Sequence, residues 1–511
     1  MKKVAKFLFH RAVFVGLSLL AQILILVVMI ARFQAYFVWF YIFCILLSVS
    51  AVAYILNGSS NPGYKIAWLI PILVFPIFGG LFYLMFGRNK LSSKQIKRMT
   101  EIGQKMQAQY PVKETILKEL TQENLEAGNQ SRYISNYTLC PPHKNTYTEF
   151  LPTGERKLEV MLEELKKAEH YIFLEYFIIE EGQMWNSILD VLVQKVKDGV
   201  DVRLIYDDMG CLMTLPYGYH KKLQQSGIKC KVFNPFIPVL YTQMNNRDHR
   251  KICVVDGYVG ITGGVNLADE YINVKEKHGH WRDAAILLKG EAVWNMTTMF
   301  LSMWDCLSSE EEDYQQYRPQ IYQKKVYKGS GYVQPFNDSP LDGEAVGETV
   351  YMNIINRAKQ YVYINTPYLI VDNEMVTALC NTAKQGVDVR IMTPHVADKK
   401  LVHASTRAYY DVLLKNGVQI YEYTPGFNHA KTFVADDMYG VVGTINLDYR
   451  SLYLHFECGV WMYGTESLKD IKKDFLTTLA KCEKIELKKP GRISLLRRLG
   501  KAILRAFAPL M

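Results

Sequence analysis

The sequence predicts an α/β protein in which two related domains face each other across a pseudo-twofold axis, preceded by a helical membrane hairpin. Three observations predict this fold. A nine-residue pattern occurs twice, about 180 residues apart, which is close to one domain length. Around both copies, stretches with helical periodicity alternate with short apolar strands. Residues 1–90, in contrast, are mostly apolar.

The repeated pattern is built on a histidine and a lysine two positions apart. The first copy is DHRKICVVD at residues 248–256, and Gly-Gly-Val-Asn follows at residues 263–266. The second copy is NHAKTFVAD at residues 428–436, and Gly-Thr-Ile-Asn follows at residues 443–446. A lone histidine is usually structural, so the duplication with matching offsets is the informative signal.

The apolar run after each lysine is short and rich in β-branched residues, which is typical of a strand. Residues two apart on a strand share a face. His249 and Lys251 therefore point the same way, as do His429 and Lys431 in the second copy. The aspartates that end the two copies have the opposite parity, and we interpret them as orienting or turn-stabilising members of the two catalytic sets. These aspartates are Asp256 and Asp436.

Two imidazoles, two ammonium groups and two carboxamides suit the transfer of a phosphodiester. One neutral histidine can attack phosphorus while the other protonates the leaving alkoxide. The lysines can hold the phosphoryl oxygens, and Asn266 and Asn446 can donate amide hydrogen bonds to them. Both asparagines are alternatively turn residues. This chemistry requires no metal and no cofactor, and the pair His278 and His280 lacks a third metal ligand at suitable spacing.

The paired pattern resembles that of the phospholipase D superfamily. The longer runs NRDHRK at residues 246–251 and NLDYRS at residues 446–451 resemble bacterial cardiolipin synthases, and the resemblance extends from roughly residue 60 to the C-terminus. It implies that His249 is the nucleophile and that an acidic residue near each histidine orients the imidazole. These acidic residues are Glu270 and Glu457, and each is alternatively a surface carboxylate. His455 departs from the family, which often has asparagine there.

The resemblance implies transfer of the phosphatidyl group of one phosphatidylglycerol to another, giving cardiolipin and glycerol through a phosphohistidine. The alternative is a hydrolase that passes the same intermediate to water and releases phosphatidic acid. Intact histidines and lysines in both copies disfavour a non-catalytic scaffold. The membrane hairpin, and the lack of an evident nucleic-acid module, disfavour a nuclease. We therefore expect phosphatidylglycerol and anionic lipids as partners and no nucleic acid; the oligomeric state is left open.

Composition agrees with an anionic partner. The chain has 511 residues and a formal net charge of +10, which on charge alone allows anionic lipid, nucleic acid or an acidic substrate. Its nine cysteines are scattered without a C-x-x-C pair. Such usage argues against a disulfide scaffold and fits a reducing compartment.

Residues 1–90 contain three apolar stretches, at 12–31, 36–56 and 66–86. The first two each have about the 20 residues that a helix needs to cross a bilayer. The third contains Pro71, Pro76 and a pair of glycines, which is typical of a kinked or re-entrant segment. Basic residues flank the whole region on both sides, so the positive-inside rule favours two full spans plus a segment that does not cross. We expect a multi-pass protein of the bacterial cell membrane with cytoplasmic catalytic domains.

Four segments follow the membrane region. Residues 91–150 are expected to form a polar connector, 151–310 the first domain, 311–334 a linker and 335–487 the second domain. The helical stretches of the connector are Lys94–Gln109 and Glu114–Leu125.

Each expected domain contains the run Gly-Val-Asp-Val-Arg, at residues 199–203 and 386–390, as the start of a predicted strand. Two such domains, each with one His-x-Lys pattern, place the active site at their interface, where the axis brings His249 near His429.

The C-terminus, residues 488–511, is predicted to be a basic amphipathic helix. Leucines, isoleucines and a phenylalanine recur at helical spacing, and arginines and lysines lie largely between them. This pattern favours binding to an anionic membrane surface. A helix that packs on its own domain is the alternative.

Overall fold

The structure is a computed structural model. It describes residues 20–25, 27–28, 32, 37–58, 61–76, 78–87, 93–110, 114–235, 245–308, 312–321, 326–487 and 495–510. Most of the apolar stretch predicted as the first membrane helix, residues 12–31, lies outside the described residues.

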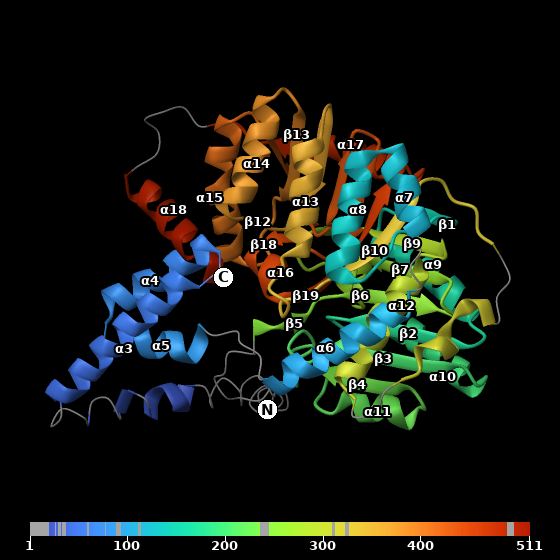
Figure 1. Ribbon diagram of the computed structural model, residues 1–511, viewed down its shortest axis with the longest axis horizontal. Helices are drawn as coiled ribbons and strands as arrows, with labels where there is room; N and C mark the ends of the chain where they lie inside the picture. Colours follow the sequence, from blue (N-terminus) through green and yellow to red (C-terminus); the bar gives the residue numbers. More distant parts are fainter. Residues whose placement is uncertain are drawn as a thin grey trace.

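Two mixed sheets form the centre of the molecule (Figure 1). The first has the strand order β1-β9-β7-β6-β2-β3-β4, in which β2, β3 and β4 run parallel and the other neighbours are antiparallel. Its strands are β1 (Thr146–Leu151), β2 (Tyr171–Tyr176), β3 (Asp201–Asp207), β4 (Lys229–Phe233), β6 (Lys251–Val255), β7 (Val259–Gly263) and β9 (Ala285–Gly290).

The second sheet repeats this order strand for strand as β10-β19-β17-β16-β11-β13-β14 and adds β20 beside β14. Its strands are β10 (Tyr332–Asp338), β11 (Tyr361–Asn365), β13 (Asp388–Pro394), β14 (Gln419–Tyr423), β16 (Thr432–Ala435), β17 (Tyr439–Gly443), β19 (His455–Tyr463) and β20 (Cys482–Lys484). The counterparts β11, β13 and β14 are again the parallel ones. The predicted pair of related α/β domains is therefore confirmed.

One apolar core is shared by both sheets. Val254 of β6, Val434 of β16 and Val460 of β19 are fully buried in it. Each such aliphatic side chain stabilises the fold by about 1.5–3 kcal/mol. Helices α12 (Val293–Cys306) and α17 (Ser467–Leu479) also contribute to this core, and each contacts the edge strand of the opposite domain. The interface between the domains is thus built like a protein interior.

Further helices complete each domain. The first domain has α9 (Gly154–Lys166), α10 (Gln183–Lys197) and α11 (Tyr219–Gln225). The second has α13 (Val346–Arg357), α14 (Asn373–Lys384), α15 (Lys400–Lys415) and the short α16 (Tyr449–Tyr453). Their buried faces are apolar, as in α10, which buries Met184, Trp185, Ile188 and Leu192.

The aspartate that ends each repeated pattern lies in the turn after the motif strand. Asp256 has φ 48° and Asp436 has φ 54°, in the left-handed region that aspartate and asparagine tolerate. The Asp256 carboxylate accepts three backbone hydrogen bonds, from Glu169, His170 and Tyr171, at 2.7–2.8 Å. Asp436 accepts the equivalent three at the start of β11. Both aspartates therefore tie the turn to the start of the neighbouring strand, away from the reacting atoms.

We expect Asp256→Ala to lower the free energy of unfolding by about 3 kcal/mol, because three backbone N–H groups lose their acceptor. Asp256→Asn should cost less, since its Oδ1 can still accept the bonds from His170 and Tyr171. Thermal and denaturant unfolding of the detergent-solubilised protein measures both. Equal destabilisation by the two variants would contradict this account.

The region expected to be a polar connector is part of the catalytic body. Its helices are α6 (Ser93–Ala108), α7 (Glu114–Glu123) and α8 (Leu125–Thr138). Leu120, Ala127 and Ile134 are fully buried in the core of the second domain. Strand β1, which begins within 91–150, is the edge of the first sheet. The overall polar composition of residues 91–150 obscured the narrow apolar faces of these helices. Those faces pack on the second domain, which lies far along the chain.

The expected linker also differs in part from the structure. It contains two short 3-10 helices, η4 (Tyr314–Tyr317) and η5 (Pro319–Ile321), and its last residues already belong to β10. Tyr314 and Tyr317 are buried in the shared core, which explains why this tyrosine-rich segment is ordered there.

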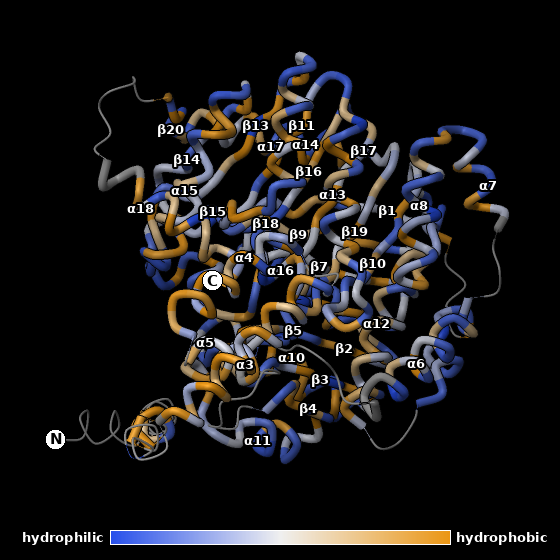
Figure 2. The backbone as a smooth tube through the Cα atoms, turned by 60° about the vertical axis from the view of Figure 1, so that its left-hand side comes forward, coloured by the Kyte–Doolittle hydropathy of each residue, from blue (hydrophilic) through white to orange (hydrophobic). Residues whose placement is uncertain are grey.

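Helices α3 (Phe37–Asn57), α4 (Pro62–Val74) and α5 (Gly79–Phe86) form one packed group, here called the membrane module. Within the described residues, Val38–Asn57 is the helix long and apolar enough to cross a membrane. The module lies beside the second domain and is strongly hydrophobic (Figures 1 and 2). Its exposed apolar side chains include Trp39, Phe43, Leu46, Val49, Leu73 and Phe75. Such exposure suits a lipid environment.

The third apolar stretch is broken into α4 and α5, with the break next to Pro76. At about 1.5 Å per residue, each helix is much shorter than a bilayer core of about 30 Å. A Cβ at Gly79 would lie 2.4 Å from Ile72 Cα, and the Ser48 hydroxyl donates to the Pro76 carbonyl at 2.6 Å. This close packing folds α5 back against α3 and α4, as expected for a kinked or re-entrant segment.

The C-terminal helix α18 (Leu495–Phe507) packs on α15 and α4. Lys501 bonds to Asp411, and the Arg505 guanidinium lies 5.2 Å from the centre of the Tyr409 ring. Leu499 is 57% exposed and Ile503 is 50% exposed. The helix therefore uses cations to contact its own domain and leaves apolar side chains outside, beside the membrane module.

Candidate active site

Each motif histidine is held against the opposite domain. His249 follows β5 (Arg247–Asp248), which pairs in parallel with the first residues of β19, and its N–H donates to the Phe456 carbonyl at 2.9 Å. His429 follows β15 (Gly426–Asn428), which pairs with β8 (His280–Arg282), and its N–H donates to the Arg282 carbonyl at 2.7 Å. The two cross-domain contacts are thus equivalent, and the pseudo-twofold axis relates one to the other.

A buried carboxylate from the opposite domain binds each imidazole. His249 Nδ1 lies 2.9 Å and 3.0 Å from the two carboxylate oxygens of Glu457. His429 Nδ1 lies 2.6 Å from Asp283 Oδ2. Both carboxylates are fully buried. A carboxylate accepts only, so we assign the imidazole proton to Nδ1, which leaves Nε2 of each histidine as the nitrogen available for chemistry. Lys431 Nζ also lies 2.9 Å from His429 Nδ1.

Asp283 was not predicted from the sequence, and the prediction for Glu270 was wrong. The Glu270 carboxylate accepts a hydrogen bond from Lys277 at 2.9 Å and does not contact either motif histidine. The register of the strands identifies Asp283 as the equivalent of Glu457. Gly263 pairs with Ala285 and Gly443 pairs with Gly459, so the residues two positions earlier, Asp283 and Glu457, are counterparts.

The residue after the first glycine of each Gly-x-x-Asn run lies against the carboxylate that binds the histidine. A Cβ at Gly264 would lie 2.0 Å from Asp283 Oδ1, so only glycine fits there. Its counterpart Thr444 donates its hydroxyl to Glu457. The two halves therefore hold their carboxylates differently, by close approach in one and by an added hydrogen bond in the other.

Lys251 and Lys431 are each 1% exposed. Each ammonium group donates to the backbone carbonyl of the histidine two positions earlier. Burial lowers the pKa of Lys251 to about 8 and that of Lys431 to about 7, and the nearby Lys251 cation lowers the pKa of Lys431 further. The two motifs are thus close enough for their cations to interact. An anion placed between them would relieve the repulsion.

Burial also lowers the pKa of both motif histidines, and the lysine cations act in the same direction. The carboxylates oppose this shift, since each favours an imidazolium. Burial disfavours the charged imidazolium more strongly, so both histidines are neutral at pH 7 in the empty site. A neutral imidazole with a free Nε2 is the form that can attack phosphorus.

We expect phosphate-like anions to bind more weakly as the pH rises from 6.5 to 9. A lysine with a lowered pKa carries its charge below that pKa and loses it as the pH rises through about 7 to 8. The Kd for tungstate, measured by calorimetry, should therefore increase about tenfold over this interval. In Lys431→Met the increase should be smaller, because one of the two titrating cations is gone. A pH-independent Kd would contradict the account.

The two motif asparagines differ in the structure. Asn266 Oδ1 accepts from the Ile178 N–H at 3.1 Å, and its Nδ2 donates to the Tyr271 hydroxyl at 2.7 Å. Its amide is therefore used in internal contacts, and phosphate binding by the second Nδ2 hydrogen stays a prediction. Asn446 is buried and its Oδ1 has no hydrogen-bond partner. Asn446 remains a candidate ligand for the phosphoryl group through its Nδ2 donor, since the amide oxygen can only accept hydrogen bonds.

The surroundings of the two histidines are unequal. Aromatic rings surround His429, with Tyr271, Trp281 and Phe427 centred 5.3–5.9 Å from it. His249 has Phe177 at 5.1 Å and His455 at 5.6 Å. His455, the residue that departs from the family pattern, is therefore directly beside one catalytic candidate.

Within the part of the chain that the structure describes, His278 and His280 are not part of a group of side chains that could hold a metal ion. His278 packs near Trp281 and Phe427, and His280 Nδ1 lies 3.1 Å from the Tyr423 hydroxyl. Among the described residues, the group that could hold a metal ion is instead His249, His455 and Glu457, whose ligand atoms lie within 4.8 Å of one another. Glu457 in this group already binds His249 Nδ1.

Comparison with known proteins places this chain in a family. The family described as "Cardiolipin synthase, PLD-like domain" matches residues 161–304 and 351–479, which contain both His-x-Lys patterns. The family described as "Phospholipase_D-nuclease N-terminal" matches residues 46–88, which cover much of the membrane module.

Full-length relatives agree. A protein of Streptococcus mutans of uncharacterised function is 45% identical over 91% of this chain and 100% of its own length. Cardiolipin synthases of Alkalihalophilus pseudofirmus and Geobacillus kaustophilus are each 33% identical, over 88% and 92% of this chain and 90% and 94% of their own lengths. The crystal structure of phosphatidylserine synthase from Haemophilus influenzae has a TM-score of 0.55 at 14% identity and covers 75% of this chain and 99% of its own. That likeness shows the fold alone.

The duplicated fold and its paired histidines define a protein of the phospholipase D superfamily. Within that superfamily, the chain belongs to the bacterial cardiolipin synthase family.

Proposed function

We propose that this protein is a cardiolipin synthase, which transfers the phosphatidyl group of one phosphatidylglycerol to the glycerol hydroxyl of another and releases glycerol. One observation carries the proposal. Two buried histidines, each bound at Nδ1 by a carboxylate of the opposite domain, share one interface with two buried lysines. Membership in the cardiolipin synthase family supports the choice of substrate.

In the first half-reaction, Nε2 of one histidine attacks phosphorus and the bond from phosphorus to the glycerol oxygen breaks. The other histidine donates its proton to that oxygen. This histidine gains the proton when the lipid anion binds, because a nearby negative charge favours the imidazolium. Lys251, Lys431 and Asn446 hold the non-bridging oxygens. The resemblance to phospholipase D enzymes assigns the attack to His249 and the proton transfer to His429.

In the second half-reaction, the hydroxyl of another phosphatidylglycerol attacks the phosphohistidine. The now neutral second histidine takes the hydroxyl proton, the new oxygen–phosphorus bond forms, and the first histidine is released as a neutral imidazole. Protons and charge balance over the two steps, so no metal or cofactor enters the proposal.

A membrane location supports transfer over hydrolysis. The helix Val38–Asn57 anchors the protein, and the exposed apolar residues of α18 extend the lipid-facing side. We propose a multi-pass arrangement in the bacterial cell membrane, with both catalytic domains in the cytoplasm. The bilayer then supplies the acceptor lipid at high local concentration against water.

The test is a product assay with the purified protein in vesicles of labelled phosphatidylglycerol, with a chelator present. We expect cardiolipin and glycerol in equal amounts. Phosphatidic acid with glycerol as the main products would favour the hydrolase. No product from phosphatidylglycerol would contradict the proposed substrate.

A further inference from the structure

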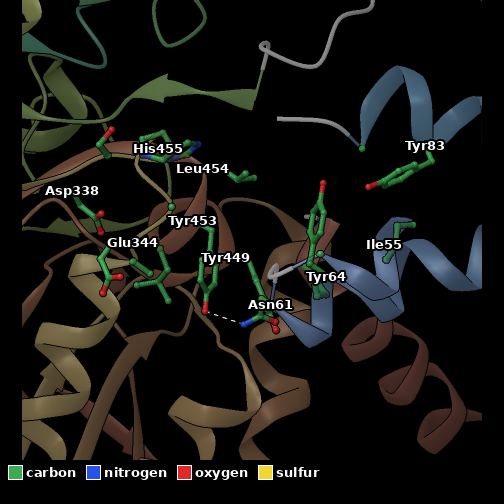
Figure 3. Close-up of a pocket in the computed structure, with 18 of the residues that line it drawn as sticks. Ile55, Asn61, Tyr64, Tyr83, Asp338, Glu344, Tyr449, Tyr453, Leu454 and His455 are labelled. Atoms are coloured by element: carbon green, nitrogen blue, oxygen red, sulfur yellow. Dashed lines mark hydrogen bonds between the residues drawn. The ribbon is translucent and has the colours of Figure 1, made fainter. Parts of the chain in front are cut away.

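A cavity of about 580 Å³ lies between the membrane module and the second domain (Figure 3). Tyr64 and Tyr83 line it from the membrane module. On the other side it is lined by Asp338 at the end of β10, by Glu344 from the segment between β10 and α13, and by His455 at the start of β19. The cavity therefore joins a lipid-facing surface to the catalytic body.

The inner end of this cavity reaches His455, which lies beside His249. His455 lines the cavity, its ring centre lies 5.6 Å from that of His249, and its Nδ1 lies 3.8 Å from Glu457 Oε1. Both ring nitrogens of His455 are buried without a hydrogen-bond partner. Asp338 is the cross-strand partner of Glu457 in the sheet. A molecule in the cavity would thus be next to the groups that position His249.

The outer wall is held in a fixed position. Asn61 caps α4, because its Oδ1 accepts from the Gly63 N–H at 2.8 Å. Its Nδ2 donates to Asp372 at 2.8 Å and to the Tyr453 hydroxyl at 3.0 Å. A Cβ at Gly63 would lie 2.7 Å from the Tyr449 hydroxyl, so the helix start fits closely on α16. The run Asn61-Pro62-Gly63 therefore docks the membrane module on the catalytic domain and forms the cavity.

The lining has the chemistry of a polyol site. It contains two carboxyl groups, Asp338 and Glu344, together with several tyrosines, and no lysine or arginine among the described residues. Carboxylates accept hydrogen bonds from hydroxyls and repel phosphate. Both oxygens of Asp338 accept backbone hydrogen bonds, from Val346 and Gly347, and burial raises its pKa to about 8. Near neutral pH Asp338 therefore acts as a hydrogen-bond donor to a hydroxyl, and Glu344 supplies the charged carboxylate. The lining of the cavity therefore suits an uncharged diol and disfavours a phosphate.

A cation that can bind the phosphate of the same lipid lines an adjacent cavity. A second cavity of about 300 Å³ shares Tyr64, Leu454 and Pro509 with the first and is lined by Arg450. A guanidinium is well suited to bind phosphate. Its other lining residues include Trp68 and Phe82 of the membrane module, which suit the lipid's apolar part.

We propose that the larger cavity is the subsite for the glycerol headgroup of phosphatidylglycerol, through which the lipid reaches the histidines from the bilayer. This inference rests on the proposed function and names the part of the molecule that selects a polyol over water. The glycerol hydroxyls bind Asp338 and Glu344, the phosphate of an acceptor lipid lies on the Arg450 side, and its acyl chains lie along the membrane module.

The test measures how the phosphatidyl-enzyme intermediate divides between water and free glycerol. The full-length protein in vesicles of unlabelled phosphatidylglycerol is given labelled glycerol. Transfer returns labelled phosphatidylglycerol, and hydrolysis gives phosphatidic acid. The ratio of the two products depends only on steps after the intermediate, so changes in donor binding do not affect it.

Glu344→Gln should shift this ratio about tenfold toward phosphatidic acid, since a charged hydrogen bond to the polyol is weakened. The internal bond from the Tyr133 hydroxyl to Glu344 can remain, because glutamine keeps an acceptor oxygen. Glu159→Gln, the same change at an exposed ion pair of the first domain, should leave the ratio unchanged. Ser339→Trp, which fills the cavity from its loop, should slow entry of the donor lipid and lower total product, and should shift the ratio of the remaining products at least as far toward phosphatidic acid.

An unchanged ratio in both Glu344→Gln and Ser339→Trp would overturn the headgroup subsite while leaving the proposed function intact. A wild-type protein that forms neither cardiolipin nor labelled phosphatidylglycerol would instead overturn the proposed function itself. If Ser339→Trp fails to fold, as thermal unfolding would show, Glu344→Gln alone decides.

Discussion

His249→Ala and His429→Ala should each reduce cardiolipin formation by at least about 10⁴-fold. One variant lacks the nucleophile and the other lacks the acid that protonates glycerol, so neither can complete the first half-reaction at a useful rate. The double variant should be little worse than either single one, because residues that act as a unit lose their effect together. Initial rates in phosphatidylglycerol vesicles measure all three.

The same pair of variants identifies the nucleophile. After long incubation and a quench in alkaline detergent, which preserves the acid-labile phosphorus–nitrogen bond, phosphate label should accumulate slowly on protein that retains His249 and lacks His429, because both formation and breakdown of the intermediate are slow there. The label should be absent when His249 is replaced. The reverse result would exchange the two roles without changing the chemistry. His278→Ala is the matched control, because that residue lies near Trp281 but outside the carboxylate-bound pair, and it should keep activity within a few-fold. Activity that survives loss of both motif histidines would contradict the mechanism.

The crossed carboxylates explain why the site needs two domains. Glu457 of the second domain binds His249 of the first, and Asp283 of the first binds His429 of the second. Short parallel strand pairs, β5 with β19 and β15 with β8, set both contacts. Either half alone would therefore present a histidine without its carboxylate and one lysine in place of two.

What could be predicted from the sequence was set by local pattern and by duplication. The motif strands, the turn aspartates Asp256 and Asp436, and the break in the third apolar stretch all depend on residues close in the chain. Duplication then implied a shared interface. Asp283 could not be recognised in this way, because nothing local distinguishes it from Glu270; only the register of β9 against β7 places it beside His429.

The remaining differences have the same origin. Helices α7 and α8 looked like a solvated connector, because their buried positions are few and their partner is the second domain. Asn266 looked equivalent to Asn446 in the sequence, yet the Asn266 amide donates a hydrogen bond to the Tyr271 hydroxyl. The C-terminal helix showed both cations and an apolar face, but the pattern alone could not say that the cations would contact α15 and the apolar side chains would remain exposed.

Glu457→Gln and Asp283→Asn should each lower kcat for cardiolipin formation by about 10³-fold, with a smaller change in KM. Each carboxylate fixes the tautomer that leaves Nε2 free and stabilises the imidazolium that forms during proton transfer. The amide variants keep the shape but lose the charge. Glu270→Gln is the matched control: its carboxylate pairs with Lys277, so the substitution should leave kcat nearly unchanged.

The pH profile separates positioning from simple loss of structure. Without the Glu457 charge, the imidazolium of His249 is less stable, so its pKa in the complex falls and the limb of the kcat profile that reports it moves to lower pH. Without the Asp283 charge, the same shift applies to His429. Glu457→Asp should restore part of the rate, because it keeps the charge and Thr444 can still donate to it. Variants that lose activity without any movement of either limb would show that these carboxylates stabilise the interface rather than tune the imidazoles.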